Sequence, residues 1–171
     1  MLTGKKIGLR KIDKSDLEFL KDWRNMSSYR KYFREYRELN LDDQLNWYEK
    51  FVMNDKGTLM FAIVELSSNE LIGACGLCYI NWVQRNADLS LYIGKDDIYV
   101  DEAKEGLAWE SMQVLFQYAF EELNLHRIWT EIYTIDKKKR ELFERFGMKL
   151  DGVLRGTYFY KGKFINSYIY S

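Results

Sequence analysis

The sequence predicts one α/β domain over residues 1–171, with a single mixed, mostly antiparallel sheet of about seven strands flanked by about four helices. Three observations predict it. Strand-like and helix-like segments follow one another in the order β-α-α-β-β-β-α-β-α-β-β. Short polar turns join several neighbouring strands, which is typical of antiparallel pairs. No proline, internal repeat or low-complexity segment marks a point at which the chain would divide into two domains.

The first half of the chain supplies one strand, two helices and three further strands. Asp13 or Ser15 can cap the first helix, and Asn40 or Asp42 can cap the second, because their short polar side chains accept from free helical N–H groups. A polar turn at 67–70 predicts a hairpin. In order, the segments are 5–12 (strand), 12–25 (helix), 42–52 (helix), 58–66 (strand), 70–80 (strand) and 87–94 (strand).

The second half is organised around a long helix at 108–123. One face carries Ala108, Met112, Leu115, Ala119 and Leu123, and Trp109, Phe116 and Phe120 form a second apolar stripe beside it. We therefore expect this helix to be buried on more than one side. A strand at 126–135 follows, then a helix at 136–147 that Asp136 caps and Gly147 closes, then two strands joined at 161–163.

Composition excludes several classes of protein. The formal net charge is zero, so nothing in bulk charge attracts nucleic acid or an anionic membrane. No apolar run reaches the roughly 18 residues that span a bilayer. The basic N-terminus lacks the apolar segment of a secretory signal, so we expect a cytoplasmic protein. Cys75 and Cys78 fall in a strand, on opposite faces and without a second Cys/His cluster, so we expect buried, inert thiols and no metal site.

The segment between the strand at 87–94 and the long helix predicts an anion site. The strand ends at Gly94, a loop follows, and Gly106 and Ala108 stand where the helix begins. Small residues allow a ligand to approach the backbone, and the first N–H groups of a helix attract an anion. Main-chain donors around Leu107 would then bind a phosphate-bearing ligand. The alternative is a core helix with an ordinary glycine at its start.

A basic run gives a second indication of an anionic ligand. Lys137, Lys138, Lys139 and Arg140 crowd the first turn of the helix that Asp136 caps. Cations at a helix N-terminus oppose the helix dipole, and a bound anion would offset that cost. The alternative is a solvated basic surface.

The order of elements, together with four runs of residues, resembles the GNAT (Gcn5-related) N-acetyltransferases, and within them the branch of ribosomal-protein N-terminal and spermidine acetyltransferases. The runs are INWVQRNADLSLYIG, YAFEELNLHRIWTEI, ELFERFGMKLDGVLRG and YKGKFINSYIYS. The resemblance covers essentially the whole chain. It implies the GNAT fold and transfer of an acetyl group from acetyl-CoA, as co-substrate, to a primary amine.

The resemblance also implies which residues bind the coenzyme. In the family the loop carries Arg/Gln-x-x-Gly-x-Gly/Ala, which Gly106 and Ala108 match, whereas Ala103 departs from it and the loop is acidic. The backbone of the preceding strand would lie along the pantetheine arm. The implied coenzyme-binding residues are Leu91, Tyr92, Ile93, Lys104, Glu105, Gly106, Leu107, Ala108, Asp136, Lys139 and Phe143.

Acetyl transfer needs a base for the ammonium proton and a donor for the departing thiolate. Glu131 is the expected base, since it matches a strand position that bears a catalytic Glu in some N-terminal acetyltransferases; the alternative is a carboxylate paired with Arg or Lys. Phe143 stands where many members carry a Tyr acid, and Phe cannot donate. Tyr133 or water could serve instead. A catalytically idle acyl-CoA-binding module is the hypothesis of another class.

The acceptor is expected to lie against the first two helices, on Trp23, Arg24, Asn25, Gln44 and Trp47. The W-R-N run followed by Q-x-x-W resembles amino-sugar acetyltransferases and suggests a nucleotide-linked aminosugar. A polyamine such as spermidine and a protein N-terminus remain alternatives, as does a merely solvated helix face. An exposed final strand could pair across a homodimer.

Overall fold

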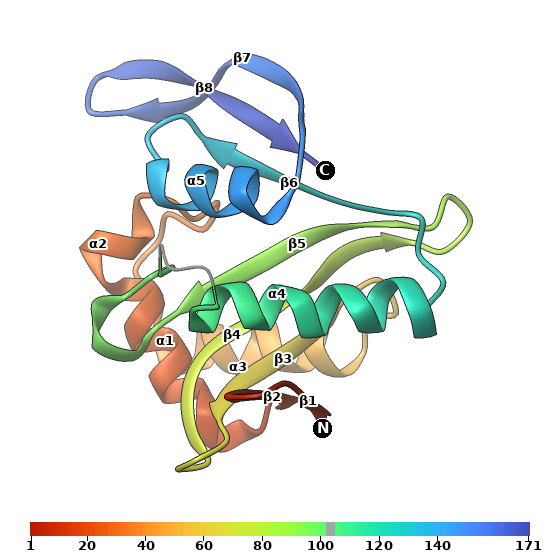
Figure 1. Cartoon of the computed structure of the whole chain (residues 1–171). Coiled ribbons are helices and arrows are strands. Elements are labelled where there is room, and N and C mark those ends of the chain that lie inside the picture. Colours follow the sequence, from red (N-terminus) through yellow and green to blue (C-terminus); the bar gives the residue numbers. More distant parts are fainter. Residues whose placement is uncertain (102–104) are drawn as a thin grey trace.

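The computed structural model describes residues 1–101 and 105–171. Within these ranges eight strands form one sheet in the order β1-β2-β3-β4-β5-β6-β8-β7, and its neighbours are antiparallel except for β5 and β6 (Figure 1). The predicted mixed, mostly antiparallel sheet is confirmed, with the two-residue β1 as an additional strand. The strands are β1 (Leu2–Thr3), β2 (Ile7–Lys11), β3 (Leu59–Glu65), β4 (Glu70–Asn81), β5 (Asn86–Ile93), β6 (Arg127–Tyr133), β7 (Leu150–Tyr160) and β8 (Lys163–Tyr170).

The helices cover both faces of the sheet. In Figure 1, α4 crosses one face, while α1 and α3 lie behind the sheet. Single π-helical turns at 48–53 and 118–122 extend α3 and α4, and the short α2 comes from the Arg- and Tyr-rich segment that has no clean period. The helices are α1 (Leu17–Asn25), α2 (Ser27–Arg30), α3 (Leu41–Trp47), α4 (Leu107–Gln117) and α5 (Lys137–Phe146).

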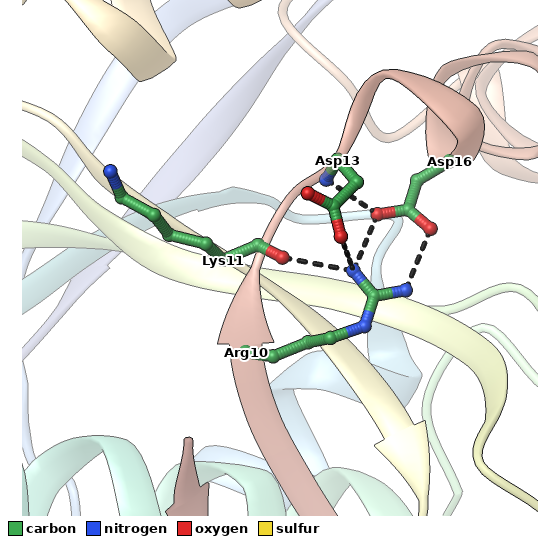
Figure 2. Close-up of polar contacts among 4 residues, drawn as sticks. All are labelled: Arg10, Lys11, Asp13 and Asp16. Carbon is green, nitrogen blue, oxygen red and sulfur yellow. Dashed lines mark hydrogen bonds and ion pairs between the residues drawn. The ribbon is translucent and has the colours of Figure 1, made fainter.

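An ion pair fixes the start of α1 to the end of β2 (Figure 2). The Arg10 guanidinium donates to both carboxylate oxygens of the buried Asp16, at 2.7 and 2.8 Å. Asp16 also accepts from the Asp13 N–H at 2.8 Å, and Asp13 caps the short helical turn that precedes α1. A bidentate pair restricts orientation as well as distance. It therefore sets the direction of α1, whose other end carries Arg24.

The predicted burial of α4 is confirmed on its main face, where Ala108, Met112, Leu115 and Ala119 have no exposed surface. The second stripe is covered only in part. Trp109 and Phe116 pack on the ring of Phe146 from α5, with ring centroids 4.9 and 5.2 Å apart. Phe120 is 42% exposed, because α5 ends before it can reach that last turn.

Strands β5 and β6 separate, and this separation creates the space for a site. They pair only from Asn86–Arg127 to Asp88–Trp129. Beyond that point β6 pairs with β8 instead, and Figure 1 shows β5 and β6 diverging toward the start of α4 and α5. Gly94 ends β5 where the chain turns away; a side chain there would overlap the Trp23 ring of α1.

The final strand, β8, does not lie at an edge of the sheet, as a dimer contact through it would require. β8 runs between β6 and β7, so both of its edges are already paired, and the edge of the sheet is β7. The expectation of an exposed final strand was therefore wrong. It failed because the sequence shows that two strands form a hairpin but not which of them enters the sheet first.

The two cysteines differ in how far they are buried. Cys75 is fully buried, which raises the pKa of its thiol, whereas Cys78 is only partly covered, with a pKa raised to about 11 mainly by burial.

Among the described residues no three His, Cys, Asp or Glu side chains lie close enough to hold a metal ion. In the same residues no helix is both long and apolar enough to cross a membrane.

Candidate active site

A cavity of about 220 Å³ opens where β5 and β6 diverge, and we call it the inner cavity. Alternation along β5 turns Asp88, Ser90 and Tyr92 to the same face, so all three line it. Thr130 and Glu131 line it from β6. Further walls come from Lys139 at the start of α5 and from Arg24, Phe33, Arg34, Trp47 and Tyr79.

The direction of the main-chain groups of β5 follows from their bonds. Ile93 N–H donates to the Tyr99 carbonyl at 2.7 Å rather than to β4, and the Leu89 carbonyl accepts from the Thr130 hydroxyl at 3.3 Å. Alternate residues of an antiparallel strand bond to the same side. Leu91, which lies between these two residues, therefore turns its N–H and C=O toward the gap between β5 and β6.

Of the three strand residues expected to bind the coenzyme through their backbone, only Leu91 keeps main-chain groups for it. The Ile93 carbonyl already accepts from Tyr99 N–H at 2.9 Å and from the Tyr29 hydroxyl at 2.7 Å. Tyr92 turns its main chain toward β4, opposite Ala74. Its ring, in contrast, lines the inner cavity, so Tyr92 can contact a ligand only through its side chain.

Two carboxylates meet at one guanidinium in the inner cavity. Asp88 accepts from Arg34 at 2.7 Å, and Glu131 lies 3.9 Å from the same guanidinium and accepts from the Ser167 hydroxyl. Asp88 is 5% exposed, and burial raises the pKa of its carboxyl while Arg34 opposes that rise. Its Oδ1 has no partner among the described residues. The sequence analysis found Glu131 but missed Asp88.

A β-bulge adds a further residue that the sequence analysis missed. The pairing of β4 with β5 is irregular between Cys78 and Asn81, and Tyr79 there has a φ of 51°, in the left-handed region. A bulky residue adopts this conformation only where its surroundings impose it, and bulges redirect side chains near sites. The Tyr79 ring lies 5.9 Å from the Arg34 guanidinium and forms part of the cavity wall.

A second cavity, the outer cavity of about 300 Å³, lies beside the first one, against α1 and α3. Arg24, Glu35 and Trp47 line both cavities, and Gln44 lines the outer one. Three of the five predicted acceptor residues, Arg24, Gln44 and Trp47, are therefore brought together.

The other two predicted acceptor residues serve the fold. The Asn25 amide donates to the Leu39 carbonyl at 2.8 Å and accepts from its N–H at 2.9 Å, which ties α1 to the segment before α3. The Trp23 ring packs on Gly94 and edge-on to Tyr92, 6.5 Å between centroids. Neither lines a cavity wall, because residues adjacent on a helix point in different directions.

The predicted anion site at the start of α4 holds the protein's own carboxylate. Leu107 N–H and Ala108 N–H both donate to Asp101, the latter at 3.2 Å. A Cβ at Gly106 would overlap that carboxylate, so the glycine provides the space for it. Of the other predicted residues, Lys104 lies outside the described residues, and the Glu105 carbonyl accepts from the Lys6 ammonium at 3.1 Å.

The start of α5 corrects two coenzyme-binding expectations. Asp136 is 2% exposed and accepts from the Tyr99 hydroxyl at 2.6 Å and from Lys139 N–H at 3.1 Å, so it caps the helix with no free surface. Phe143 is 1% exposed and packs on Tyr170. Lys139 does reach the inner cavity, 5.1 Å from the Tyr99 ring centroid, and burial lowers the pKa of its ammonium.

Tyr133, the expected acid, lies outside the inner cavity. Its ring stacks on Tyr158 from β7, with centroids 3.8 Å apart and planes 6° from parallel. Residues 131 and 133 of β6 share a face, but Tyr133 lies two residues further from the point where the strands separate. The expectation that Tyr133 donates a proton in the cavity is therefore not supported by its position.

These residues fit a coenzyme with a diphosphate and an extended arm. Asp101 marks the anion-binding donors at the start of α4 by occupying them. From there the unpaired stretch of β5 leads to Leu91 and to the carboxylates of the inner cavity. An extended amide-containing arm can bond to such a strand edge as another strand would.

Comparison with known proteins places the chain in a family. The model of the acetyltransferase (GNAT) domain matches residues 6–149. The chain belongs to the GNAT acetyltransferases. This acetyltransferase is 26% identical over 156 residues to the spermidine N(1)-acetyltransferase of Vibrio cholerae serotype O1, covering 91% of this chain and 86% of the relative.

Solved structures share the fold of this acetyltransferase. A crystal structure of spermidine N-acetyltransferase from Vibrio cholerae in complex with CoA and spermine has a TM-score of 0.85 at 24% identity, covering 96% of this chain and 94% of the other. A dodecameric structure of the enzyme from that organism has a TM-score of 0.79 at 24% identity, with coverages of 96% and 92%. The acetyltransferase is thus an N-acetyltransferase of the GNAT family that is similar to the spermidine N(1)-acetyltransferases.

Proposed function

We propose that this acetyltransferase moves the acetyl group of acetyl-CoA to a small primary amine bound in the inner cavity. The observation that carries the proposal is the unpartnered, buried carboxylate oxygen of Asp88, beside the gap into which Leu91 directs its main chain. A buried acceptor without a partner favours a ligand that donates, and an amine does so.

Asp88 and Glu131 have different roles in removing the amine proton. Burial raises the pKa of Asp88, which makes it a better proton acceptor than an exposed aspartate. Glu131, at 22% side-chain exposure, connects the site to solvent. Arg34 holds the two carboxylates at one guanidinium and opposes the rise that burial causes in the pKa of Asp88.

Bound acetyl-CoA supplies an activated thioester, and the protein aligns and polarises it. Leu91 N–H faces the gap, where it can donate to the thioester oxygen as negative charge develops. Lys139 replaces the missing tyrosine as proton donor to the thiolate, since its ammonium lines the same cavity. In the balanced reaction Asp88 takes one proton from the ammonium, and the amine nitrogen then bonds to the acetyl carbon as the carbon–sulfur bond breaks. The thiolate takes a proton from Lys139, and the second proton that the nitrogen loses as the amide forms returns to the Lys139 amine.

Two classes of acceptor have support from different observations. The spermidine N-acetyltransferase relatives favour a polyamine. The Arg24 and Gln44 side chains favour an amine with oxygen acceptors, such as a nucleotide-linked aminosugar. A protein N-terminus has no specific observation in its favour.

The experiment is an acetyl-CoA thiol-release assay with spermidine, UDP-linked aminosugars and short peptides side by side, on the wild type and on Asp88→Asn. We expect release with at least one amine and a loss of about a hundredfold or more in kcat/KM for Asp88→Asn. Asp151→Asn is the matched control, because this exposed aspartate pairs with Arg127 far from the cavity. Coenzyme binding without release for any amine would instead identify an idle acyl-CoA-binding module.

We also propose that copies of this chain associate through the β7–β8 hairpin. Its edge strand is unpaired among the described residues, and Phe159 and Phe164 are 60% and 71% exposed. Such an apolar edge invites pairing with another chain. Light scattering should show smaller assemblies for Phe159→Lys but not for Phe19→Lys, an equally exposed residue on α1. A monomeric wild type would contradict the proposal.

A further inference from the structure

Three buried side-chain atoms lack a hydrogen-bond partner among the described residues, and all belong to residues that line the two cavities. They are Arg24 Nε, Gln44 Nε2 and Asp88 Oδ1. Buried polar atoms nearly always have partners, so three unpaired ones around the same two cavities point to a bound molecule, water or ligand, that completes their hydrogen bonding. The ligand must donate at Asp88 and accept at Arg24 and Gln44.

The polarity of the two ends does not depend on how the Gln44 amide is oriented. An arginine guanidinium has donors only, and a carboxylate, as Asp88 is in its pair with Arg34, has acceptors only. Gln44 is 1% exposed, so its amide is held in the wall rather than free to turn into solvent. The site therefore has one acceptor end and one donor end.

The two ends lie in adjacent cavities. Arg24, Glu35 and Trp47 form walls of both the inner and the outer cavity, and an acceptor that reaches from Asp88 to Gln44 has to extend past these shared residues. The inner end receives the amine next to the gap between β5 and β6. The outer end, against α1 and α3, receives the remainder of the acceptor molecule.

The charges of the outer cavity favour an anion there. Its two carboxylates are engaged: Glu35 accepts from Arg37 at 2.7 and 2.9 Å, and Asp43 accepts from the Asn40 N–H at 3.1 Å. Arg24 and Lys50 have no ion-pair partner within the described part of the chain. A second ammonium placed there would be repelled by the positive charges of Arg24 and Lys50, whereas a carboxylate or phosphate would pair with them.

We propose that the acceptor is a primary amine carrying an anionic oxygen group, a carboxylate or a phosphate, which Arg24 and Gln44 bind while Asp88 receives the nitrogen. This specificity rests on the acetyl transfer proposed above and names the substrate class of that site. The transfer step is the same: the nitrogen–carbon bond forms, the carbon–sulfur bond breaks, one amine proton passes to Asp88, the thiolate takes a proton from Lys139 and the second amine proton returns to Lys139. Such an acceptor differs from the polyamines named for the relatives.

Matched amines test the proposal on the wild type. γ-Aminobutyrate, n-butylamine and putrescine share a four-carbon chain and end in a carboxylate, a methyl group and an ammonium. Phosphoethanolamine against ethanolamine tests phosphate in the same way. We expect the anionic member of at least one set to exceed its neutral or cationic partners by about tenfold or more in kcat/KM, equivalent to 1.4 kcal/mol.

Variants test whether the preference comes from the outer cavity. Arg24→Gln and Gln44→Leu should bring the ratio of anionic to neutral amine toward one, and Arg24→Lys should restore part of it. Lys21→Gln, the same charge change on α1 outside both cavities, should keep the wild-type ratio.

Three results have distinct meanings. A retained preference in Arg24→Gln would contradict the assignment to Arg24. Putrescine or spermidine exceeding every anionic amine on the wild type would overturn the substrate class while leaving acetyl transfer intact. Absence of thiol release with every amine would refute acetyl transfer itself, and this proposal with it.

Discussion

Replacing Asp101 by alanine should destabilise the free protein and yet tighten its binding of coenzyme A. In the free protein the Asp101 carboxylate accepts from Leu107 N–H and Ala108 N–H at the start of α4, an eleven-residue helix. These are the donors expected to hold the coenzyme diphosphate. The carboxylate and the diphosphate therefore compete for one site, and the variant removes one competitor.

The magnitude follows from the two effects that Asp101 combines. Loss of a helix cap costs about 1 kcal/mol, and loss of an anion at a helix N-terminus costs about 0.3–1 kcal/mol. A total of about 1–2 kcal/mol corresponds to a fall in Tm of about 2–8 °C for a chain of this size. The same energy no longer opposes the coenzyme, so its Kd should fall by about 5–30-fold.

Thermal unfolding without ligand and calorimetric titration with coenzyme A measure the two effects on the same samples. Asp101→Asn should lie between wild type and Asp101→Ala, because the amide oxygen still accepts a hydrogen bond but carries no charge. Asp97→Asn is the matched control, an exposed acid of the same loop with no described bond to α4. A Kd that rises in Asp101→Ala would refute competition and make Asp101 part of the coenzyme site.

Three further predictions concern the inner cavity. Arg34→Gln removes the positive charge that opposes the burial-raised pKa of Asp88, so this pKa should rise further. The acid limb of the pH profile of kcat/KM should then move to higher pH. An unmoved acid limb would argue against Asp88 as the base. Lys139→Met should lower kcat by about a hundredfold and remove a basic limb that lies below the usual lysine range, because burial lowers this pKa; pH profiles with both limbs intact would exclude Lys139 as the acid. Tyr133→Phe should leave kcat unchanged, since its ring stacks on Tyr158 outside the cavity, and a large loss would restore it as a candidate.

The fold was predictable because local signals agreed with the tertiary structure. The apolar faces of α4, the caps at Asn40 and Asp136, and the closing Gly147 all lie where their patterns indicated. The parts that could not be predicted depend on long-range pairing. Nothing local indicates that β8 rather than β7 joins β6, or that the two residues of β1 extend the sheet.

The lining of the candidate site was predictable for some residues of the first two helices and unpredictable where long-range geometry decides. Arg24, Gln44 and Trp47 meet as expected, but Asn25 is used by the fold. Asp88 had a visible signal, as the lone acid within the apolar run ADLSLYIG. Asp101 had a less specific signal, the acidity of its loop, because a carboxylate near a helix start can turn toward it or away, and only the course of the loop decides.

The central claim is that the coenzyme arm lies along β5 in the gap where β6 has diverged, with Leu91 as the main-chain contact. Amide hydrogen exchange at Leu91, measured with and without coenzyme A, tests it most directly. Leu91 N–H faces the gap and should exchange markedly more slowly with coenzyme bound, whereas Tyr92 N–H, turned toward β4, should change little. Saturating coenzyme that leaves Leu91 exchange unchanged would contradict the claim.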